Sequence, residues 1–193
     1  MPFIVTAAAL FFSLMTQVII EHIETSTRRW SVKTLSDIDG ARVSRSAPIW
    51  TTVHEQAALP APQLKSSTAR LSSEQTLYQL DGYLIATKHE IDGDYHLIIR
   101  DPSMKVTMIA EIPDPDRPEV RGTPFAKRYA AARKMIDSIA GEPSGSTHLL
   151  TRPTRVRISG IGFFDEEHPV AQEGCAPNSR ELHPVLQVEP LSR

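Results

Sequence analysis

Cysteine is almost absent from this chain of 193 residues, because Cys175 is the only one. A single cysteine excludes an internal disulfide and any zinc site built from several thiolates. Aromatic residues make up only 6% of the chain, so few rings are available for stacking on nucleic-acid bases. A formal net charge of −2 excludes a global field that would attract nucleic acid or an anionic membrane. Binding of that kind would therefore have to be local.

Charged side chains are also missing from the first twenty residues, MPFIVTAAALFFSLMTQVII. A helix of that length can cross a bilayer, so residues 1–29 are expected to be a signal peptide or a membrane anchor. A signal peptide normally begins with a basic residue, but none precedes Arg28 here. If the segment is instead an anchor, Arg28 and Arg29 would keep its C-terminal side in the cytoplasm. We expect an exported or membrane-anchored protein, or a cytoplasmic one if the assigned start is wrong.

The remaining chain is long enough for one domain. Small polar residues and prolines dominate positions 44–73, so residues 30–73 are expected to form an extended arm or linker with one helical turn near 51–58. Residues 74–193 are expected to form the folded domain.

The domain begins with strand patterns. Residues 76–88 read as a long strand with a bulge at Gly82, and Asp92-Gly93 predicts a hairpin turn with positive φ at both positions. In the next strand Tyr95, Leu97 and Ile99 share one face, and the alternate residues share the other. Residues 105–112 predict a third strand.

The period then changes to that of a helix. Apolar residues at positions 125, 129, 132, 136 and 139 form one helical stripe, with Thr123 as the expected N-cap and Gly141 at the C-terminal end. Residues 155–164 and 181–189 predict two further strands, and Pro184 favours an edge strand or the beginning of a strand. The order predicts a mainly β protein with one major helix, a five-stranded OB-fold-like barrel.

Several separated segments, including WSVKTL, DGDYHLIIRDP, TMIAEIPDP, ISGIGFFD and ELHPVL, together resemble a family of small bacterial OB-fold-like proteins. The resemblance covers most of the chain after Trp30. It implies a fold but no particular activity.

A weaker, fold-level similarity links residues 96–101 to the staphylococcal-type nucleases. That similarity implies that Asp101 binds a metal ion, with Asp81 or Glu111 as a neighbour. His96 stands where those nucleases have arginine, Pro102 where they have a threonine ligand, and Met104 where they have a catalytic glutamate. These departures argue against the same catalysis.

The residues themselves suggest two kinds of site. Carboxylates and imidazoles suit zinc or manganese, and the candidate ligand or metal residues are Asp94, His96, Asp101, Glu111 and His183. For His183 the sequence favours a packing role, in which it bonds buried backbone carbonyls or pairs with an acid such as Asp165 or Glu166, and ligand binding is the alternative. The candidate nucleic-acid face comprises Tyr83, Tyr95, Arg100, Arg155 and Arg157.

We therefore predict a non-enzymatic binding module without an obligatory cofactor. Its partner would be single-stranded nucleic acid, an oligosaccharide or a protein, with a membrane contact through the N-terminal segment if that segment is retained. The alternatives are a metal-dependent nuclease or phosphodiesterase that uses Asp94, His96, Asp101 and Glu111, and a structural envelope protein.

Overall fold

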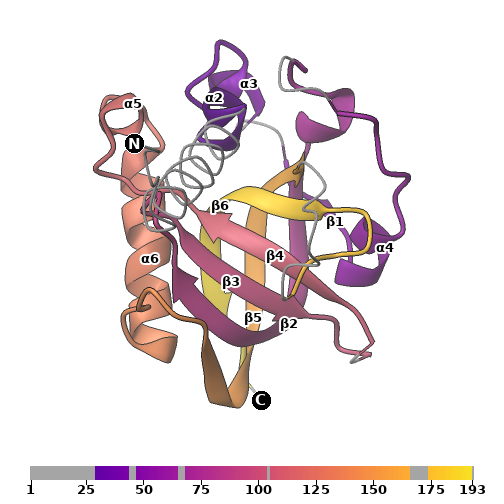
Figure 1. Ribbon diagram of the computed structural model, residues 1–193, viewed down its shortest axis with the longest axis vertical. Coiled ribbons are helices and arrows are strands. Elements are labelled where there is room, and N and C mark those ends of the chain that lie inside the picture. Colours follow the sequence, from indigo (N-terminus) through magenta and orange to yellow (C-terminus); the bar gives the residue numbers. More distant parts are fainter. Residues whose placement is uncertain (1–28, 44–46, 65–67, 104, 166–173, 193) are drawn as a thin grey trace, which may run out of the picture.

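The computed structural model describes residues 29–43, 47–64, 68–103, 105–165 and 174–192 (Figure 1). The protein is mainly β, with a six-stranded mixed sheet and few helices. The strands are β1 (Ile49–Trp50), β2 (Leu77–His89), β3 (Tyr95–Arg100), β4 (Thr107–Ile112), β5 (His148–Phe164) and β6 (Arg180–Pro190). Five of them lie where the sequence predicts strands, and β1 is an addition to the five-stranded prediction.

The strands pair in the order β1-β2-β3-β4-β6-β5, and β2 pairs with β5 as well. The β1–β2 and β4–β6 pairs are parallel, and the other pairs are antiparallel. Strand β6 therefore has neighbours on both sides, so of the two alternatives for Pro184 the edge strand is wrong. Pro184 is tolerated because it falls at a register irregularity with β5 and beyond the register pairs of β6 with β4.

The hairpin predicted at Asp92-Gly93 joins β2 to β3, but its geometry differs from the prediction. Among the two central residues only Gly93 has positive φ, at 96°. The turn spans Glu90 to Asp94, because the Glu90 N–H donates to the Asp94 carbonyl and the Gly93 N–H donates to the Glu90 carbonyl. The Asp94 N–H donates to the Asp92 carboxylate at 3.1 Å, which fixes the start of β3.

Glycine 82 was expected to mark a bulge, and the register shift of β2 lies instead between Leu84 and Ala86. A Cβ at Gly82 would lie 2.6 Å from Cγ2 of Ile99 and 3.1 Å from the Arg100 carbonyl oxygen. Gly82 is therefore needed for the close approach of β3 rather than for a bulge.

The predicted long helix is α6 (Ala126–Ala140), which stands beside the strands in Figure 1. Phe125, Tyr129, Ala132 and Ile136 of the predicted stripe are buried, and Ile139 is partly buried. Gly141 has φ of 77° and its N–H donates to the Asp137 carbonyl, as expected of a helix end. The N-cap prediction is wrong by two positions: Phe125 precedes the helix, and the Thr123 hydroxyl accepts the Phe125 N–H.

Residues 30–73, predicted to be an extended arm, combine short helices, strand β1 and stretches without regular structure where they are described. They contain α2 (Trp30–Lys33), α3 (Gly40–Val43) and the predicted turn α4 (Val53–Ala57), and α4 is closed by a capping box of Thr52 and Glu55. The remaining short elements are η1 (Ser72–Glu74) and α5 (Pro118–Arg121). The buried ion pair of Arg29 with Glu74, and a 3.0 Å bond from Arg29 to the Phe164 carbonyl, tie the segment to β5.

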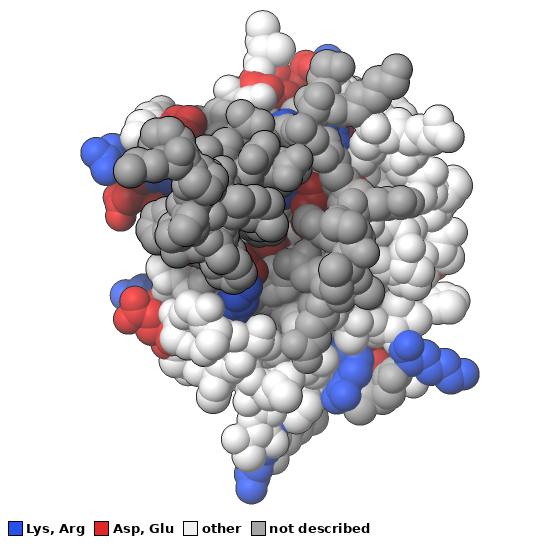
Figure 2. All heavy atoms as spheres, in the orientation of Figure 1, with Lys and Arg blue, Asp and Glu red and all other residues white. Residues whose placement is uncertain are grey.

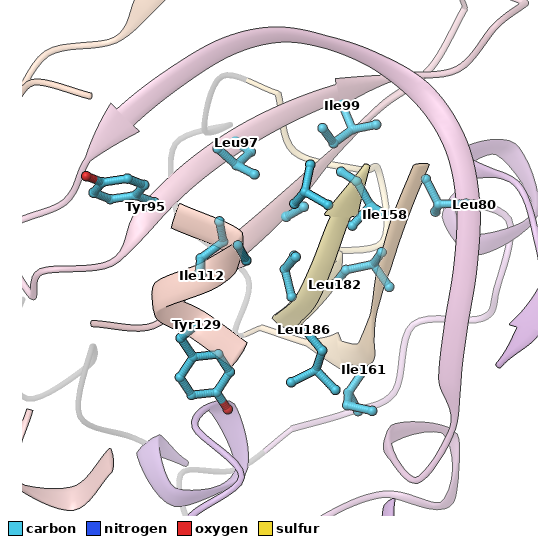
Figure 3. Close-up of a cluster of buried hydrophobic side chains, with 14 of the residues drawn as sticks. Leu80, Tyr95, Leu97, Ile99, Ile112, Tyr129, Ile158, Ile161, Leu182 and Leu186 are labelled. Carbon is cyan, nitrogen blue, oxygen red and sulfur yellow. The ribbon is translucent and has the colours of Figure 1, made fainter. Parts of the chain in front are cut away.

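The apolar core fills the space between the strands, with Tyr129 of α6 at one end (Figure 3). Inward side chains of β3 and β4 alternate with outward ones, so Leu97, Ile99 and Ala110 enter the core while their neighbours point away.

The predicted N-terminal signal peptide or anchor lies outside the described residues, apart from Arg29. Within the part of the chain that the structure describes, no helix is both long and apolar enough to span a membrane.

Candidate metal site

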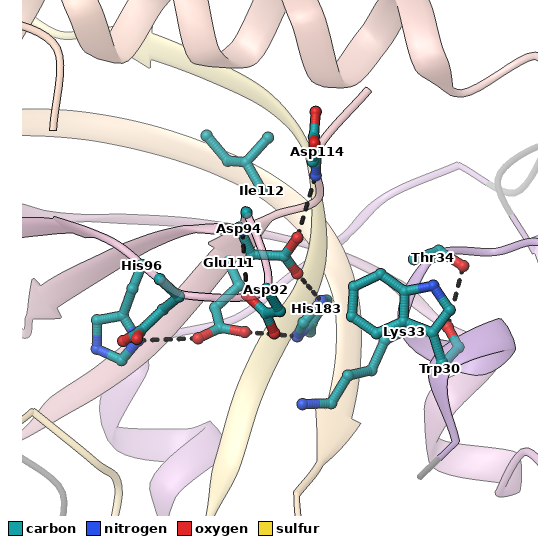
Figure 4. Close-up of polar contacts among 12 residues, drawn as sticks. Trp30, Lys33, Thr34, Asp92, Asp94, His96, Glu111, Ile112, Asp114 and His183 are labelled. Carbon is teal, nitrogen blue, oxygen red and sulfur yellow. Dashed lines mark hydrogen bonds and ion pairs between the residues drawn. The ribbon is translucent and has the colours of Figure 1, made fainter. Parts of the chain in front are cut away.

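Polar side chains are buried on the outward face of three neighbouring strands. Strand pairing brings them together, because His96 of β3 lies directly opposite Glu111 of β4. The parallel β4–β6 register pairs Ile109 with Glu181 and Ala110 with Leu182. One residue further along this register, His183 of β6 lies beside Glu111 of β4, and the two side chains point to the same face (Figure 4).

The side chains form a continuous row of polar contacts. His96 Nδ1 lies 2.8 Å from Oε1 of Glu111, and the other Glu111 oxygen lies 3.0 Å from Nδ1 of His183. His183 Nε2 in turn lies 3.4 Å from Oδ2 of Asp94. The row ends in the backbone, because the Asp114 N–H donates to Oδ1 of Asp94 at 3.1 Å. The structure thus brings together four of the five residues predicted to bind a ligand or metal.

Several atoms in the row lack a well-aligned hydrogen bond although they are buried. Both ring nitrogens of His183 and Oδ2 of Asp94 have carboxylate or imidazole neighbours at ion-pair distance, but no partner with hydrogen-bond geometry. His183 is 1% exposed and Asp94 is fully buried. These atoms are held by ion-pair contacts rather than by aligned hydrogen bonds, so the cluster offers atoms to which a ligand could bond directly.

A metal ion fits this donor set. One ligand atom from each of Asp94, Glu111 and His183 can be chosen so that all three lie within 4.8 Å of one another. Two carboxylates and one imidazole suit zinc or manganese, and three protein ligands leave positions open for water or another ligand. His96 would then orient the Glu111 carboxylate through a hydrogen bond, as residues that contact metal ligands without binding the metal commonly do.

The proton affinities of the cluster reflect burial and mutual contact. Burial lowers the pKa of His183, but the nearby carboxylates of Asp94, Glu111 and Glu181 outweigh this and hold the pKa well above its ordinary value. For Glu111 burial raises the pKa, and contacts with His183 and His96 outweigh it and hold the pKa well below its ordinary value. Burial raises the pKa of Asp94 and of Glu181.

A lysine from the N-terminal segment completes the surroundings. Lys33 of α2 points toward the cluster in Figure 4, and its Nζ lies 3.1 Å from Oδ2 of Asp165. Burial lowers the pKa of Lys33, but Asp165, Glu111 and Glu181 outweigh this and raise the pKa. Lys33 therefore supplies a fixed positive charge beside the carboxyl groups of Glu111, Asp165 and Glu181.

Sequence reasoning did not include Lys33, and its position gave no signal because the helix that carries it is far from β6 in the chain. The alternation Glu181-Leu-His183 did signal that Glu181 shares a face with His183, and Oε2 of Glu181 lies 3.7 Å from Nδ1 of His183. The expected partner Asp165 pairs with Lys33 instead of His183. Glu166 lies outside the described residues.

Asp94 and His96 are more deeply buried than outward strand positions ordinarily are: Asp94 is fully buried and His96 is only 4% exposed. Asp101 does not join the cluster: its carboxylate accepts the N–H of Ser103 at 2.7 Å and of His54 at 3.4 Å. It therefore fixes the turn after β3 and the start of α4. Met104, at the position of the nuclease glutamate, lies outside the described residues.

The predicted nucleic-acid residues separate into two groups. Tyr83 of β2 lies opposite both Arg100 of β3 and Arg155 of β5, and Arg157 follows on the same face of β5. Tyr95 does not belong with them, because its ring is buried under the Arg133 guanidinium, 4.2 Å from the ring centroid. In the view of Figure 2, basic and acidic side chains of the described residues are interspersed rather than gathered in a patch of one sign.

Comparisons with known proteins add little to this geometry. No protein-family model matches the chain, and no curated protein matches it. A solved structure, "OBody AM3L09 bound to hen egg-white lysozyme", is similar to 70% of this chain and 99% of its own, at 10% identity and a TM-score of 0.37.

Proposed function

We propose that the protein is a binding module that holds one divalent transition-metal ion at Asp94, Glu111 and His183. The observation that carries the proposal is His183, a buried imidazole between two acidic side chains with neither ring nitrogen in a good hydrogen bond. An ion at this place would bind one ring nitrogen of His183 together with Oδ2 of Asp94, and the other ring nitrogen would keep a carboxylate neighbour.

We also propose that the scaffold is an OB-type barrel. The pairings run from β2 through β3, β4, β6 and β5 and return to β2, and helix α6 lies between β4 and β5 in the chain. Such a ring of five strands is the arrangement expected of a partly open Greek-key barrel. The metal site would then lie on the outer wall.

The donor set favours zinc or manganese over calcium. Calcium prefers six to eight oxygen ligands, whereas this site offers an imidazole and two carboxylates. The nuclease-like calcium site built on Asp101 is not supported, because Asp101 caps a turn elsewhere.

Calorimetric titration of the metal-free full-length protein with zinc and with manganese tests the proposal. We expect one ion per chain for the unmodified protein, and affinity at least tenfold weaker for His183→Gln, because a ligand is lost. His148→Gln is the matched control, since His148 is exposed at the start of β5.

The proposal fails if the unmodified protein takes up neither ion, or if His183→Gln binds as tightly as the control. Failure would favour a purely structural role, such as that of an envelope protein.

A metal-dependent phosphodiesterase is the second candidate, and Glu181 is the observation that favours it. Burial raises the pKa of this carboxyl group, and its Oε2 has no hydrogen-bond partner. A carboxylate with a raised pKa beside a metal site can accept a proton from an attacking water. Lys33 is placed to offset negative charge nearby.

Cleavage assays on single-stranded DNA and RNA with manganese or zinc test this candidate. We expect Glu181→Gln to abolish cleavage while the calorimetric metal affinity is kept. A protein that binds the metal but cleaves neither polymer would be a binding module only.

A further inference from the structure

A second polar surface lies away from the metal site, on the outward face of β2 and its neighbours. It comprises Trp50, Tyr83, Arg100, Arg155 and Arg157, which we name the tyrosine–arginine face. Tyr83 is its centre, because register places Arg100 on one side of it and Arg155 on the other. Residues directly opposite on paired strands point to the same side, so the ring has a guanidinium at each flank.

Strand β1 extends this face with an exposed indole. Trp50 is 57% exposed, and the Arg157 guanidinium lies over its ring at 4.6 Å from the centroid. Trp50 is in register with Gln79, four residues before Tyr83 on β2, so the two rings stand about 13 Å apart along the strand. Two aromatic rings at this spacing could each stack on a base of one extended strand.

The arginines of this face are held in place but retain donors for an anion. Asp81 accepts bonds from Nε of Arg157 at 2.8 Å and from Arg155 at 3.4 Å. The side chains of Arg155 and Arg157 are 45% and 31% exposed and can therefore reach a bound phosphate, whereas Nε of Arg100 is buried without a hydrogen-bond partner. Glu189 of β6 is in register with Arg157 and adds a second acid beside Asp81. The three arginines of the face therefore exceed its two acids by one positive charge.

We propose that the tyrosine–arginine face binds single-stranded nucleic acid, with bases stacked on Trp50 and Tyr83 and phosphates at the three arginines. Aromatic rings exposed on a strand surface favour an unpaired strand, because the bases of a duplex are already stacked on one another. The inference does not depend on metal binding, because the two sites share no residue. His96 and Arg100 lie on the same outward face of β3 but four residues apart, which is about 13 Å along the strand.

Fluorescence anisotropy of a labelled twelve-nucleotide oligothymidine, with a twelve-base-pair duplex as comparison, tests the proposal. We expect the single strand to bind at low salt and the duplex to bind at least tenfold more weakly. For three phosphates the logarithm of the association constant should fall with the logarithm of salt concentration with a slope of about −2.

Substitutions then locate the surface. We expect Trp50→Ala and Tyr83→Ala each to weaken binding about tenfold, and Arg155→Gln to make the salt slope shallower by about 0.7. Arg121→Gln, an exposed arginine on α5, and Ile91→Ala, a 95% exposed apolar residue in the hairpin turn, are matched controls without expected effect.

Tryptophan emission gives an independent readout. The chain has two tryptophans, and Trp30 lies under the Arg117 guanidinium at 3.9 Å from its ring centroid. Addition of oligothymidine should quench the emission of the unmodified protein but not of Trp50→Phe.

Three results would overturn the proposal: no binding at low salt, equal binding of duplex and single strand, or unchanged binding in both Trp50→Ala and Arg155→Gln. His183→Gln should still bind the oligonucleotide, so loss of metal binding and loss of this surface can be told apart. Unchanged thermal unfolding of each variant controls for misfolding.

Discussion

Both faces of strand β3 are buried, but the side chains on one face are apolar and several of those on the other are polar or charged. Leu97 and Ile99 enter the apolar core, whereas Asp94 and His96 meet Glu111 and His183 on the other side. The apolar face gains stability from area removed from water and tolerates small changes of shape. The polar face depends on each charge retaining its partner, because a buried charge without one is costly. Substitutions of single polar groups should therefore reduce stability most on the face that holds the proposed metal site.

The largest effect should come from removing one acid of the polar face. Glu111→Gln leaves His96 and His183 without their shared carboxylate, and breaking such buried pairs costs about 3–5 kcal/mol. Urea unfolding of the metal-free variant measures the change, with Glu119→Gln on α5 as the control. A loss below about 1 kcal/mol, the usual value of an exposed pair, would mean that the cluster is solvated.

Metal binding should strengthen with pH over the range in which His183 loses its proton. The ion requires a neutral imidazole, so the affinity should rise about tenfold per pH unit, or about 1.4 kcal/mol, until the pH passes the raised pKa of His183. Titrations at pH 6, 7 and 8 measure this slope. An affinity independent of pH would contradict His183 as a ligand.

The metal-free protein should show the opposite trend in its stability. The pKa of His183 is higher in the folded than in the unfolded chain, so folding takes up a proton. This contribution is fully present below about pH 6.5, the unfolded value, and is lost as the pH rises through the folded value. His183→Gln should remove that part of the pH dependence of urea unfolding.

The smallest effect should come from trimming the apolar face. Ile99→Val removes one methylene group from a fully buried side chain, which costs about 0.5–1.5 kcal/mol. Metal affinity should stay the same, because Ile99 points away from the cluster. If this variant proved less stable than Glu111→Gln, the contrast between the two faces would be wrong.

Most of the strands could be predicted from the sequence, because alternation and turn residues are local signals. The Tyr95–Arg100 strand and the helical stripe from Phe125 to Ile136 are confirmed. Strand β1 was missed because two residues carry no periodicity. The first part of β5 was missed because Pro153 argues against a strand. In the structure Pro153 lies in the part of β5 where the register with β2 shifts, so no backbone hydrogen bond to β2 is needed from it.

The candidate site was predictable in its residues but not in its burial. Asp94, His96, Glu111 and His183 could be selected as donors on outward strand positions, but outward positions are ordinarily exposed. Their burial depends on packing between segments far apart in the chain, such as Lys33 against Asp165, and no local pattern encodes such contacts. Asp101 lies outside the cluster, and the sequence could not indicate this because a carboxylate that caps a turn has the same sequence appearance as a ligand.

The central claim is that one ion sits among Asp94, Glu111 and His183. Anomalous X-ray scattering at the zinc edge from crystals of the zinc-loaded protein tests it most directly. The account predicts a single strong peak within bonding distance of His183 and the two carboxylates. A zinc peak elsewhere with this cluster empty, or no ordered zinc at saturating concentration, would contradict it.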